Sequence, residues 1–261
     1  MKKCVAIVGA GIIAVGTATL AEASPIITDG LVAAYEFSGN ANDTSGNGLN
    51  GTVYGATLSS DRFGNANSAY RFDGNDSVVT PNFSAQNNGT ISFWFEATAW
   101  QANGSGIISS RSWNGYENGD LVIGEQETAS PLRAFYRADN SWHFALTSFP
   151  LQAGEWHNAI LTWDATSGTT FYVNNVAVAY NPYAAPIFHD IPLTFGVQGY
   201  SGGSRYFSGL IDDIYIYDHA LTSTEINSLY NEAAPVPEPA TMLLMGTGLA
   251  GLVGARRKKN K

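Results

Sequence analysis

Short runs of alternating apolar and polar residues, separated by glycine, asparagine, aspartate and serine, fill the chain from about residue 26 to residue 217. In the run Thr90–Glu96, the side chains of Ile91, Phe93 and Phe95 fall on one face, as expected for a strand with one buried side. Many short strands with almost no helical periodicity are typical of a β-sandwich or a jelly roll. The pattern therefore predicts an all-β domain built from two antiparallel sheets.

Two hairpins are predicted in the second half of this region. The runs Asn158–Trp163 and Thr170–Val173 flank the turn residues Asp164–Gly168, and the pair Asn174–Asn175 follows the second run directly. Asparagine tolerates the positive φ that a two-residue hairpin turn requires, so we expect a tight turn at this pair. The run Gly209–Tyr217 predicts the last long strand.

One short helix is predicted after the last strand. Thr222 and Glu225 have the spacing of a capping box, in which each side chain bonds to the backbone of the other residue. Ile226, Leu229 and Tyr230 follow at helical spacing, which predicts an apolar face that covers part of a sheet.

Residues 1–23 have the pattern of a secretory signal peptide. Lys2 and Lys3 precede an uncharged, mostly apolar stretch at 5–20, and Ala21–Ala23 supplies the small residues for cleavage before Ser24. The alternative is a buried N-terminal helix, which the glycines of this stretch disfavour. Cleavage by signal peptidase would also remove the only cysteine of the chain.

Residues 233–261 form a second targeting pattern. Pro237, Glu238 and Pro239 precede the apolar or small residues 240–255, and a basic tail closes the chain. Apolar residues followed by positive charge predict a short transmembrane anchor with the body outside the cytoplasm. The three parts together resemble the PEP-CTERM sorting signal. That resemblance implies transient anchoring in the inner membrane of a Gram-negative bacterium, cleavage by an exosortase, and release to the surface or extracellular matrix. A plain anchor is the alternative.

The order of short sequence motifs in the body indicates a family more specifically than the strand pattern does. The motifs are Gly30–Phe37, Gly39–Gly51, Tyr70–Gly74, Trp156–Ala159 and Phe207–Tyr217. They resemble the concanavalin A-like lectin/glucanase superfamily in its laminin-G-like branch, over most of a domain at 24–232. The resemblance implies a jelly roll of two antiparallel sheets. It does not settle the function, because this fold carries lectins, carbohydrate-binding modules, adhesive domains and some enzymes.

The charge balance excludes some functions. The chain has 13 lysines and arginines against 22 acidic residues, and residues 24–239 hold six arginines, no lysine and 21 acidic residues, a net charge of −15. A nucleic-acid-binding surface needs a basic stripe, so nucleic acid is not an expected partner. The same surplus disfavours unspecific binding to anionic polymers unless calcium bridges the two.

A structural calcium site is expected at the last strand. Alternation places Asp212 on the face of Leu210 and Ile214, so we expect its carboxylate to point into the core. A buried carboxylate needs a cation, and the body has few arginines to supply one. Calcium takes six to eight oxygen ligands, and the loop Asn40–Gly48 is rich in them.

The family resemblance implies the same metal, held between this loop and the last strand. The candidate ligands are Asp43 and Asp212, and then Glu36, Asn50 and Asp213. The alternative is a loop closed by Asx hydrogen bonds, with Asp212 bonded to backbone N–H groups.

No catalytic motif is evident. Glu125 and Glu127 are two carboxylates at alternate positions, but they precede a turn and are interpreted as solvated surface. His157 begins a strand and is interpreted as a packing residue. We therefore expect no enzyme, with a glycoside hydrolase or polysaccharide lyase as the remote alternative.

Aromatic rings and polar groups are combined in three loop-like stretches, Arg111–Asn118, Asp139–His143 and Gln198–Tyr206, and this is the composition of a sugar site. The candidate ligand-binding residues are Arg111, Trp113, Tyr116, Trp142, Tyr200 and Tyr206. The alternative is that these rings pack over the edge of a sheet. The sequence thus predicts a secreted, non-catalytic protein that binds exopolysaccharide or another extracellular glycan. A structural matrix or adhesion protein without a small ligand is the second hypothesis.

Overall fold

The computed structural model describes residues 27–84, 86–100, 104–112, 117–125, 132–146, 149–183, 187–199 and 205–231. These ranges lie within one compact unit, Pro25–Glu232. Within them, no helix is both long enough and apolar enough to cross a membrane. The predicted signal peptide at 1–23, the predicted anchor at 240–255 and the motif Pro237–Pro239 lie outside the described residues.

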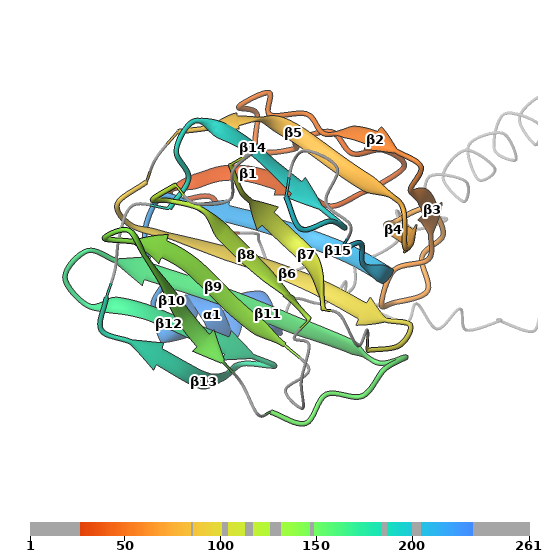
Figure 1. Ribbon diagram of the computed structural model, residues 1–261. Helices are drawn as coiled ribbons and strands as arrows, with labels where there is room; N and C mark the ends of the chain where they lie inside the picture. Colours follow the sequence, from red (N-terminus) through yellow and green to blue (C-terminus); the bar gives the residue numbers. More distant parts are fainter. Residues whose placement is uncertain are drawn as a thin grey trace, which may run out of the picture. The chain divides into compact units, whose positions relative to one another are not determined.

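Two antiparallel sheets form the described part of the chain, one in front of the other (Figure 1). The eight-stranded sheet has the order β13 (Val176–Asn181), β12 (Gly168–Val173), β11 (Trp156–Asp164), β6 (Gly89–Ala97), β15 (Ser208–Tyr217), β4 (Ala69–Asp73) and β3 (Thr57–Ser59), with β1 (Leu31–Tyr35) also paired to β15. The seven-stranded sheet has the order β10 (Ser141–Leu146), β9 (Arg133–Ala138), β8 (Leu121–Glu125), β7 (Ser105–Ser110), β14 (Ile191–Phe195), β5 (Ser77–Phe83) and β2 (Thr52–Tyr54). The predicted two-sheet sandwich is confirmed.

Aromatic side chains fill the space between the sheets. Ile91, Phe93 and Phe95 of β6 have no exposed surface, which confirms the face predicted from their alternation. Trp163 of β11 is also fully buried, and its indole Nε1 donates a hydrogen bond to the Gln86 carbonyl at 3.1 Å. Gly89 lies opposite it on β6, and a Cβ there would come within 2.2 Å of the indole ring. The buried Trp163 ring therefore leaves room only for glycine at position 89.

The predicted hairpins are both present. β11 pairs with β12 from Ala159 opposite Val173 to Asp164 opposite Gly168, around the turn at 164–168. β12 continues into β13 through Asn174 and Asn175. These two asparagines have φ values of 48° and 64°. Both central residues of the turn thus have positive φ, as a type I′ hairpin turn requires.

The helix α1 (Ser223–Tyr230) begins where the capping box predicts. The Thr222 hydroxyl accepts a hydrogen bond from the backbone N–H of Glu225, and the Glu225 carboxylate accepts one from the backbone N–H of Thr222. Ile226 and Leu229 are buried against residues of β1, β11 and β15, including Tyr217. The helix therefore covers part of the outer face of the eight-stranded sheet.

A β-bulge interrupts β15 at Asp213. Asp212 pairs with Trp94 of β6 and Tyr215 pairs with Ser92, so β15 has one residue more than β6 between these two pairs. Asp213 takes the extra position, with φ at 46°. After the bulge, the alternation of core-facing and outward-facing residues is shifted by one position, so Ile211 before it and Ile214 and Ile216 after it all face the core.

The bulge corrects the predicted direction of Asp212. Cross-strand partners point to the same side of a sheet, and the partner of Asp212 is Trp94, which stacks on Tyr230 of α1 with 5.6 Å between ring centroids. Asp212 therefore lies on the outer face of the sheet. The expectation that it shares the core face of Ile214 is wrong, because strict alternation fails at the extra residue.

The cap of α1 can be tested by substitution. Thr222→Ala removes the acceptor for the Glu225 N–H, and we expect it to lower the free energy of unfolding by about 1 kcal/mol. Chemical denaturation measures the change. Thr224→Ala, at an exposed position inside the same helix, is the matched control and should change stability by less than half as much. Equal losses in the two variants would contradict the cap.

Candidate functional site

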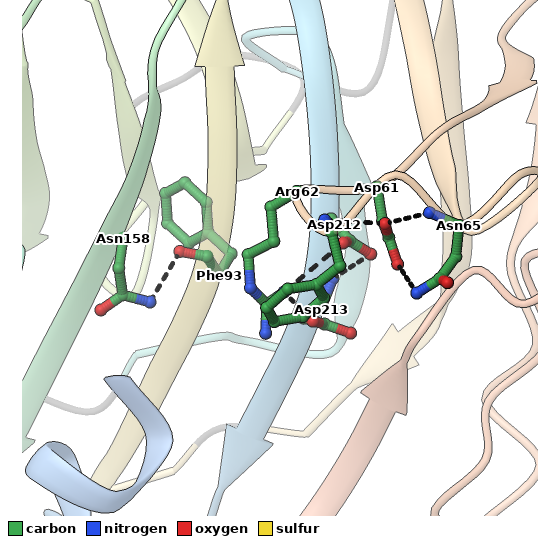
Figure 2. Close-up of polar contacts among 8 residues, drawn as sticks. Asp61, Arg62, Asn65, Phe93, Asn158, Asp212 and Asp213 are labelled. Carbon is green, nitrogen blue, oxygen red and sulfur yellow. Dashed lines mark hydrogen bonds and ion pairs between the residues drawn. The ribbon is translucent and has the colours of Figure 1, made fainter. Parts of the chain in front are cut away.

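Arg62 forms a buried ion cluster with two carboxylates of the bulge (Figure 2). Its Nη1 lies 3.5 Å from Asp212 Oδ2 and also pairs with Asp213. The guanidinium Cζ lies 4.6 Å from the centroid of the Trp94 ring. The side chains of Arg62 and Asp212 keep only 5% and 2% of their surface exposed. One of the few arginines of the body therefore pairs with Asp212, where the sequence predicts a calcium ion.

The cluster holds more carboxylates than cations. Burial raises the pKa of Asp212 to about 9, and the neighbouring Asp213 carboxylate adds to this effect, whereas Arg62 opposes it. Burial also raises the pKa of Asp213, and burial together with the Asp213 charge raises the pKa of Glu36. Glu36 thus belongs to the electrostatic surroundings of the bulge.

Asp43 belongs to a separate hydrogen-bond network in the N-terminal loop. Its Oδ1 accepts from the backbone N–H groups of Ala34 and Ser45 at 3.0 and 2.9 Å, and its Oδ2 accepts from Leu49 at 3.0 Å. Asn50 Oδ1 in turn accepts from the Asp43 N–H. Burial acts to raise the pKa of Asp43, but these hydrogen bonds hold it below its ordinary value. This network is the Asx-closed loop named as the alternative to calcium.

The described residues do not gather the expected calcium ligands. Asp43 bonds to backbone N–H groups, whereas Asp212 and Asp213 pair with Arg62. Across the described ranges, no group of three or more His, Cys, Asp or Glu side chains is placed to hold a metal ion. These residues as arranged do not fit a calcium ion, and the site stays a prediction.

A second candidate site lies on the outer face of the seven-stranded sheet. Along β9, Ala134 and Tyr136 point into the core, and the alternate residues Arg133, Phe135 and Arg137 point away from it. Their cross-strand neighbours on β10 include Trp142 and Phe144. We call this surface the aromatic–arginine face, defined by Arg111, Arg133, Phe135, Arg137, Trp142 and Phe144.

Rings and guanidinium groups contact one another across the aromatic–arginine face. Phe135 meets Trp142 edge-on with 5.2 Å between centroids, and Phe144 lies 6.0 Å from Phe135. The Arg133 guanidinium lies 4.7 Å from the Phe135 ring, and that of Arg137 lies 5.8 Å from the Trp142 ring. Phe144 remains 47% exposed. The face therefore presents apolar rings bordered by cations.

Three predicted stretches converge at one end of this face. Arg111 follows β7 directly, and its guanidinium lies 5.7 Å from the Trp142 ring. A Cβ on Gly199, in the third stretch, would lie 4.0 Å from the Arg111 side chain. Two predicted ligand-binding residues, Arg111 and Trp142, are thus neighbours, although 31 positions separate them in the sequence.

A buried polar cluster supports the strand ends beside Arg111. Asp120 has no exposed surface and accepts hydrogen bonds from the Ser112 N–H at 2.7 Å and from the Ser112 hydroxyl at 3.0 Å. Its Oδ1 also lies 2.8 Å from His189 Nε2. Glu117 Oε2 lies 3.5 Å from the other ring nitrogen of His189. These contacts tie the ends of β7 and β8 to the segment before β14.

Of the other predicted ligand-binding residues, the structure describes Tyr206. Tyr206 forms an isolated bridge with Val197 and is partly buried. Trp113, Tyr116 and Tyr200 lie outside the described residues.

Two further sequence interpretations can be compared with the structure. The Glu125 side chain is 1% exposed and its Oε2 accepts the Ser105 hydroxyl at 2.8 Å, so its interpretation as solvated surface is wrong. Glu127 lies outside the described residues. His157 is 4% exposed, with its Nε2 2.9 Å from the Gln152 carbonyl, as expected of a packing residue.

Sequence reasoning missed most of the aromatic–arginine face. Arg133, Phe135, Arg137 and Phe144 were not among the candidate residues, yet the first three alternate with apolar core residues in the strand Arg133–Ala138. An outward face that alternates arginine and phenylalanine is unusual in a chain so poor in cations. That alternation was the signal that could have identified the face.

The Asx network predicts a loss of stability that does not depend on calcium. Asp43→Ala removes the acceptor of three backbone N–H groups, and we expect the free energy of unfolding to fall by about 1 to 3 kcal/mol in EDTA. Chemical denaturation in EDTA and in excess calcium distinguishes the hydrogen-bond network from the calcium site. A loss that appears only with calcium would support the metal site and contradict the network as the main role of Asp43.

The ion cluster predicts that stability falls as pH rises in EDTA. The pKa of Asp212 is raised from 3.8 to about 9, so the folded protein keeps a proton that the unfolded chain releases between these values. The stabilisation is complete below the lower value and is lost as pH rises through the upper one. Thermal midpoints measured from about pH 5 to pH 9 should decline, and Asp212→Asn should flatten the decline. Asp29→Asn, at an exposed position, is the control and should leave the decline intact.

Comparison with known proteins extends the assignment of the fold. Domain 4 of AbnA, a GH43 extracellular arabinanase from Geobacillus stearothermophilus solved with arabinotriose, is 19% identical with a TM-score of 0.65, over 77% of this chain and 98% of that one. The binding domain of Paraclostridial Mosquitocidal Protein 1 is 20% identical with a TM-score of 0.64, over 78% of this chain. The ligand-binding domain of botulinum neurotoxin serotype D, solved with N-acetylneuraminic acid, is 15% identical with a TM-score of 0.63, also over 78%.

These likenesses show a shared fold. The chain spans about half the length of the two toxin domains, 52% and 51%. No curated protein matches the chain. The model of the PEP-CTERM protein-sorting motif matches residues 235–258. The model of the concanavalin A-like lectin/glucanases superfamily, in its laminin-G group, matches residues 72–227, more than half of the chain. The chain therefore belongs to the concanavalin A-like lectin/glucanase superfamily.

Proposed function

We propose that this is an exported, non-catalytic glycan-binding protein that acts in the exopolysaccharide or matrix around the cell. Its ligand site is the aromatic–arginine face of the seven-stranded sheet. The observation that carries the proposal is the position of Trp142, whose ring has the guanidinium groups of Arg111 and Arg137 5.7 and 5.8 Å from its centroid.

The chemistry of this face suits a sugar. Apolar ring faces take the C–H surface of a sugar ring, and a few polar groups beside them fix its orientation. Trp142 and Phe144 provide the rings, with Phe144 47% exposed, and Arg111 and Arg137 provide N–H donors next to them. Because neighbouring rings and the β9–β10 pairing hold these groups, little side-chain freedom remains to be lost on binding.

The sorting motif supports a location outside the cell. A PEP-CTERM motif at 235–258 fits export, transient anchoring in the inner membrane and processing by an exosortase. The similar domain of AbnA belongs to an extracellular enzyme and was solved with arabinotriose, which supports a glycan as the ligand class.

Glycan binding can be tested with the full chain by affinity electrophoresis. The panel holds neutral arabinan, galactan and xylan, and acidic polygalacturonate and alginate. We expect retardation by at least one polymer, and we expect Trp142→Ala to weaken it about tenfold, which is about 1.4 kcal/mol.

The control is Tyr54→Ala, which removes a ring that is 57% exposed on β2, at the opposite edge of the same sheet. Thermal melting of each variant shows whether it is folded. Retardation by no polymer, or equal retardation of folded Trp142→Ala and the parent, would contradict the proposal and favour a structural matrix protein.

A further inference from the structure

We propose that Asp120 is a positioning residue of the ligand site: its carboxylate holds the end of β7 so that Arg111 stays beside the Trp142 ring. The inference rests on the proposed function and adds how one side of that site is kept in place. It starts from a buried carboxylate that bonds twice to the residue next to Arg111.

Both carboxylate oxygens of Asp120 have hydrogen-bond partners. The residue has no exposed surface. Its Oδ1 accepts the Ser112 N–H at 2.7 Å and lies 2.8 Å from His189 Nε2. Its Oδ2 accepts the Ser112 hydroxyl at 3.0 Å and the Glu117 N–H at 3.2 Å. A carboxylate away from water is costly unless its oxygens are paired in this way. These contacts therefore fix the direction of the Asp120 side chain.

The Asp120 carboxylate bonds to the residue that follows Arg111. The N–H and the hydroxyl of Ser112 each donate to a different oxygen of the carboxylate. Arg111 comes directly after Ser110, the last residue of β7, where the pairing with β8 ends. Because consecutive Cα atoms are about 3.8 Å apart, a shift of Ser112 would also shift the backbone of Arg111. The Asp120 side chain thus holds the chain just beyond the end of β7.

The backbone of Asp120 holds the segment on the other side of Trp142. Its carbonyl accepts the Arg137 N–H at 2.9 Å, and the Gly119 N–H donates to the Arg137 carbonyl at 2.9 Å. The guanidinium groups of Arg111 and Arg137 lie 5.7 and 5.8 Å from the Trp142 ring. One residue therefore connects the two segments that flank the ring, and a side-chain substitution at position 120 removes only the connection to the Arg111 segment.

Asp120 is itself fixed against the segment before β14. The Phe188 N–H donates to the Gly119 carbonyl at 3.1 Å. Gly119 has a φ of 96°, and a Cβ there would come within 2.8 Å of the Phe188 carbonyl oxygen. His189 contacts the carboxylate from the same segment. Because the backbone before Asp120 packs this closely on residues 188–189, the carboxylate has a fixed place from which to hold Ser112.

A double-mutant cycle tests whether Asp120 acts through Arg111. Asp120→Asn keeps the shape of the side chain, but in either orientation its NH2 group faces a backbone N–H, that of Ser112 or that of Glu117. The probe is whichever of arabinan, galactan, xylan, polygalacturonate and alginate retards the full chain most in affinity electrophoresis. We expect Asp120→Asn to weaken binding about fivefold in the parent and less than about twofold in Arg111→Gln, because the guanidinium that Asp120 positions is absent there.

Asp76→Asn is the matched control. Asp76 is 5% exposed, lies directly before β5 of the same sheet and accepts the Asp73 N–H at 2.7 Å. Its substitution should lower the thermal midpoint, as Asp120→Asn should, without changing the retardation by the polymer. If melting shows that Asp120→Asn does not fold, Ser112→Ala takes its place. It removes one of the two bonds to the residue beside Arg111, and it should weaken binding in the parent but not in Arg111→Gln.

The outcomes separate this inference from the proposed function. An equal loss of binding from Asp120→Asn in the parent and in Arg111→Gln would overturn the positioning role, because Asp120 would then act by another route. Unchanged binding in folded Asp120→Asn, or an equal loss in Asp76→Asn, would overturn it as well. In each of these cases a loss in Trp142→Ala would leave glycan binding at this face intact. If no polymer of the panel retards the parent, both proposals fail.

Discussion

Each of the two sheets gives one face to a shared core, and this burial decides which side chains remain available for chemistry. Phe93, Phe95 and Trp163 have no exposed surface, so these rings of the eight-stranded sheet pack in the core and cannot contact a ligand. On β9 the same constraint has the opposite effect, because alternation sends Ala134 and Tyr136 inward and the residues between them outward. The rings and arginines of the outer surface thus alternate along the same strand with the residues that build the core.

The outer faces of the two sheets are used differently. Helix α1 covers part of the eight-stranded sheet, and Arg62 seals another part by lying over Asp212 and the Trp94 ring. The seven-stranded sheet keeps Phe144 47% exposed on its outer face. One arginine offsets only part of the cost of burying Asp212 and Asp213, which agrees with the upward shift in the pKa of both carboxyl groups.

Local sequence patterns predicted much of the fold, but they did not predict contacts between residues that are far apart in the sequence. The turn at Asn174 and Asn175 and the cap at Thr222 depend on residues within a few positions, so the pattern alone identified them. The contact of Arg62 with Asp212 joins residues 150 positions apart. The meeting of Arg111 with Trp142 depends on the order of four strands in one sheet, which alternation does not encode. The bulge at Asp213 was missed because an extra residue leaves the apolar composition of the strand unchanged.

The bulge also constrains how this domain can vary. Ile216 belongs to the core between the sheets, and Tyr215 and Tyr217 belong to the cluster under α1. Deletion of one residue at Asp213 would restore simple alternation and exchange these assignments, so that a tyrosine hydroxyl entered the core and an isoleucine faced the helix. Surface loops of related chains can gain or lose single residues freely, whereas the length of β15 across this point is fixed by both of its faces at once.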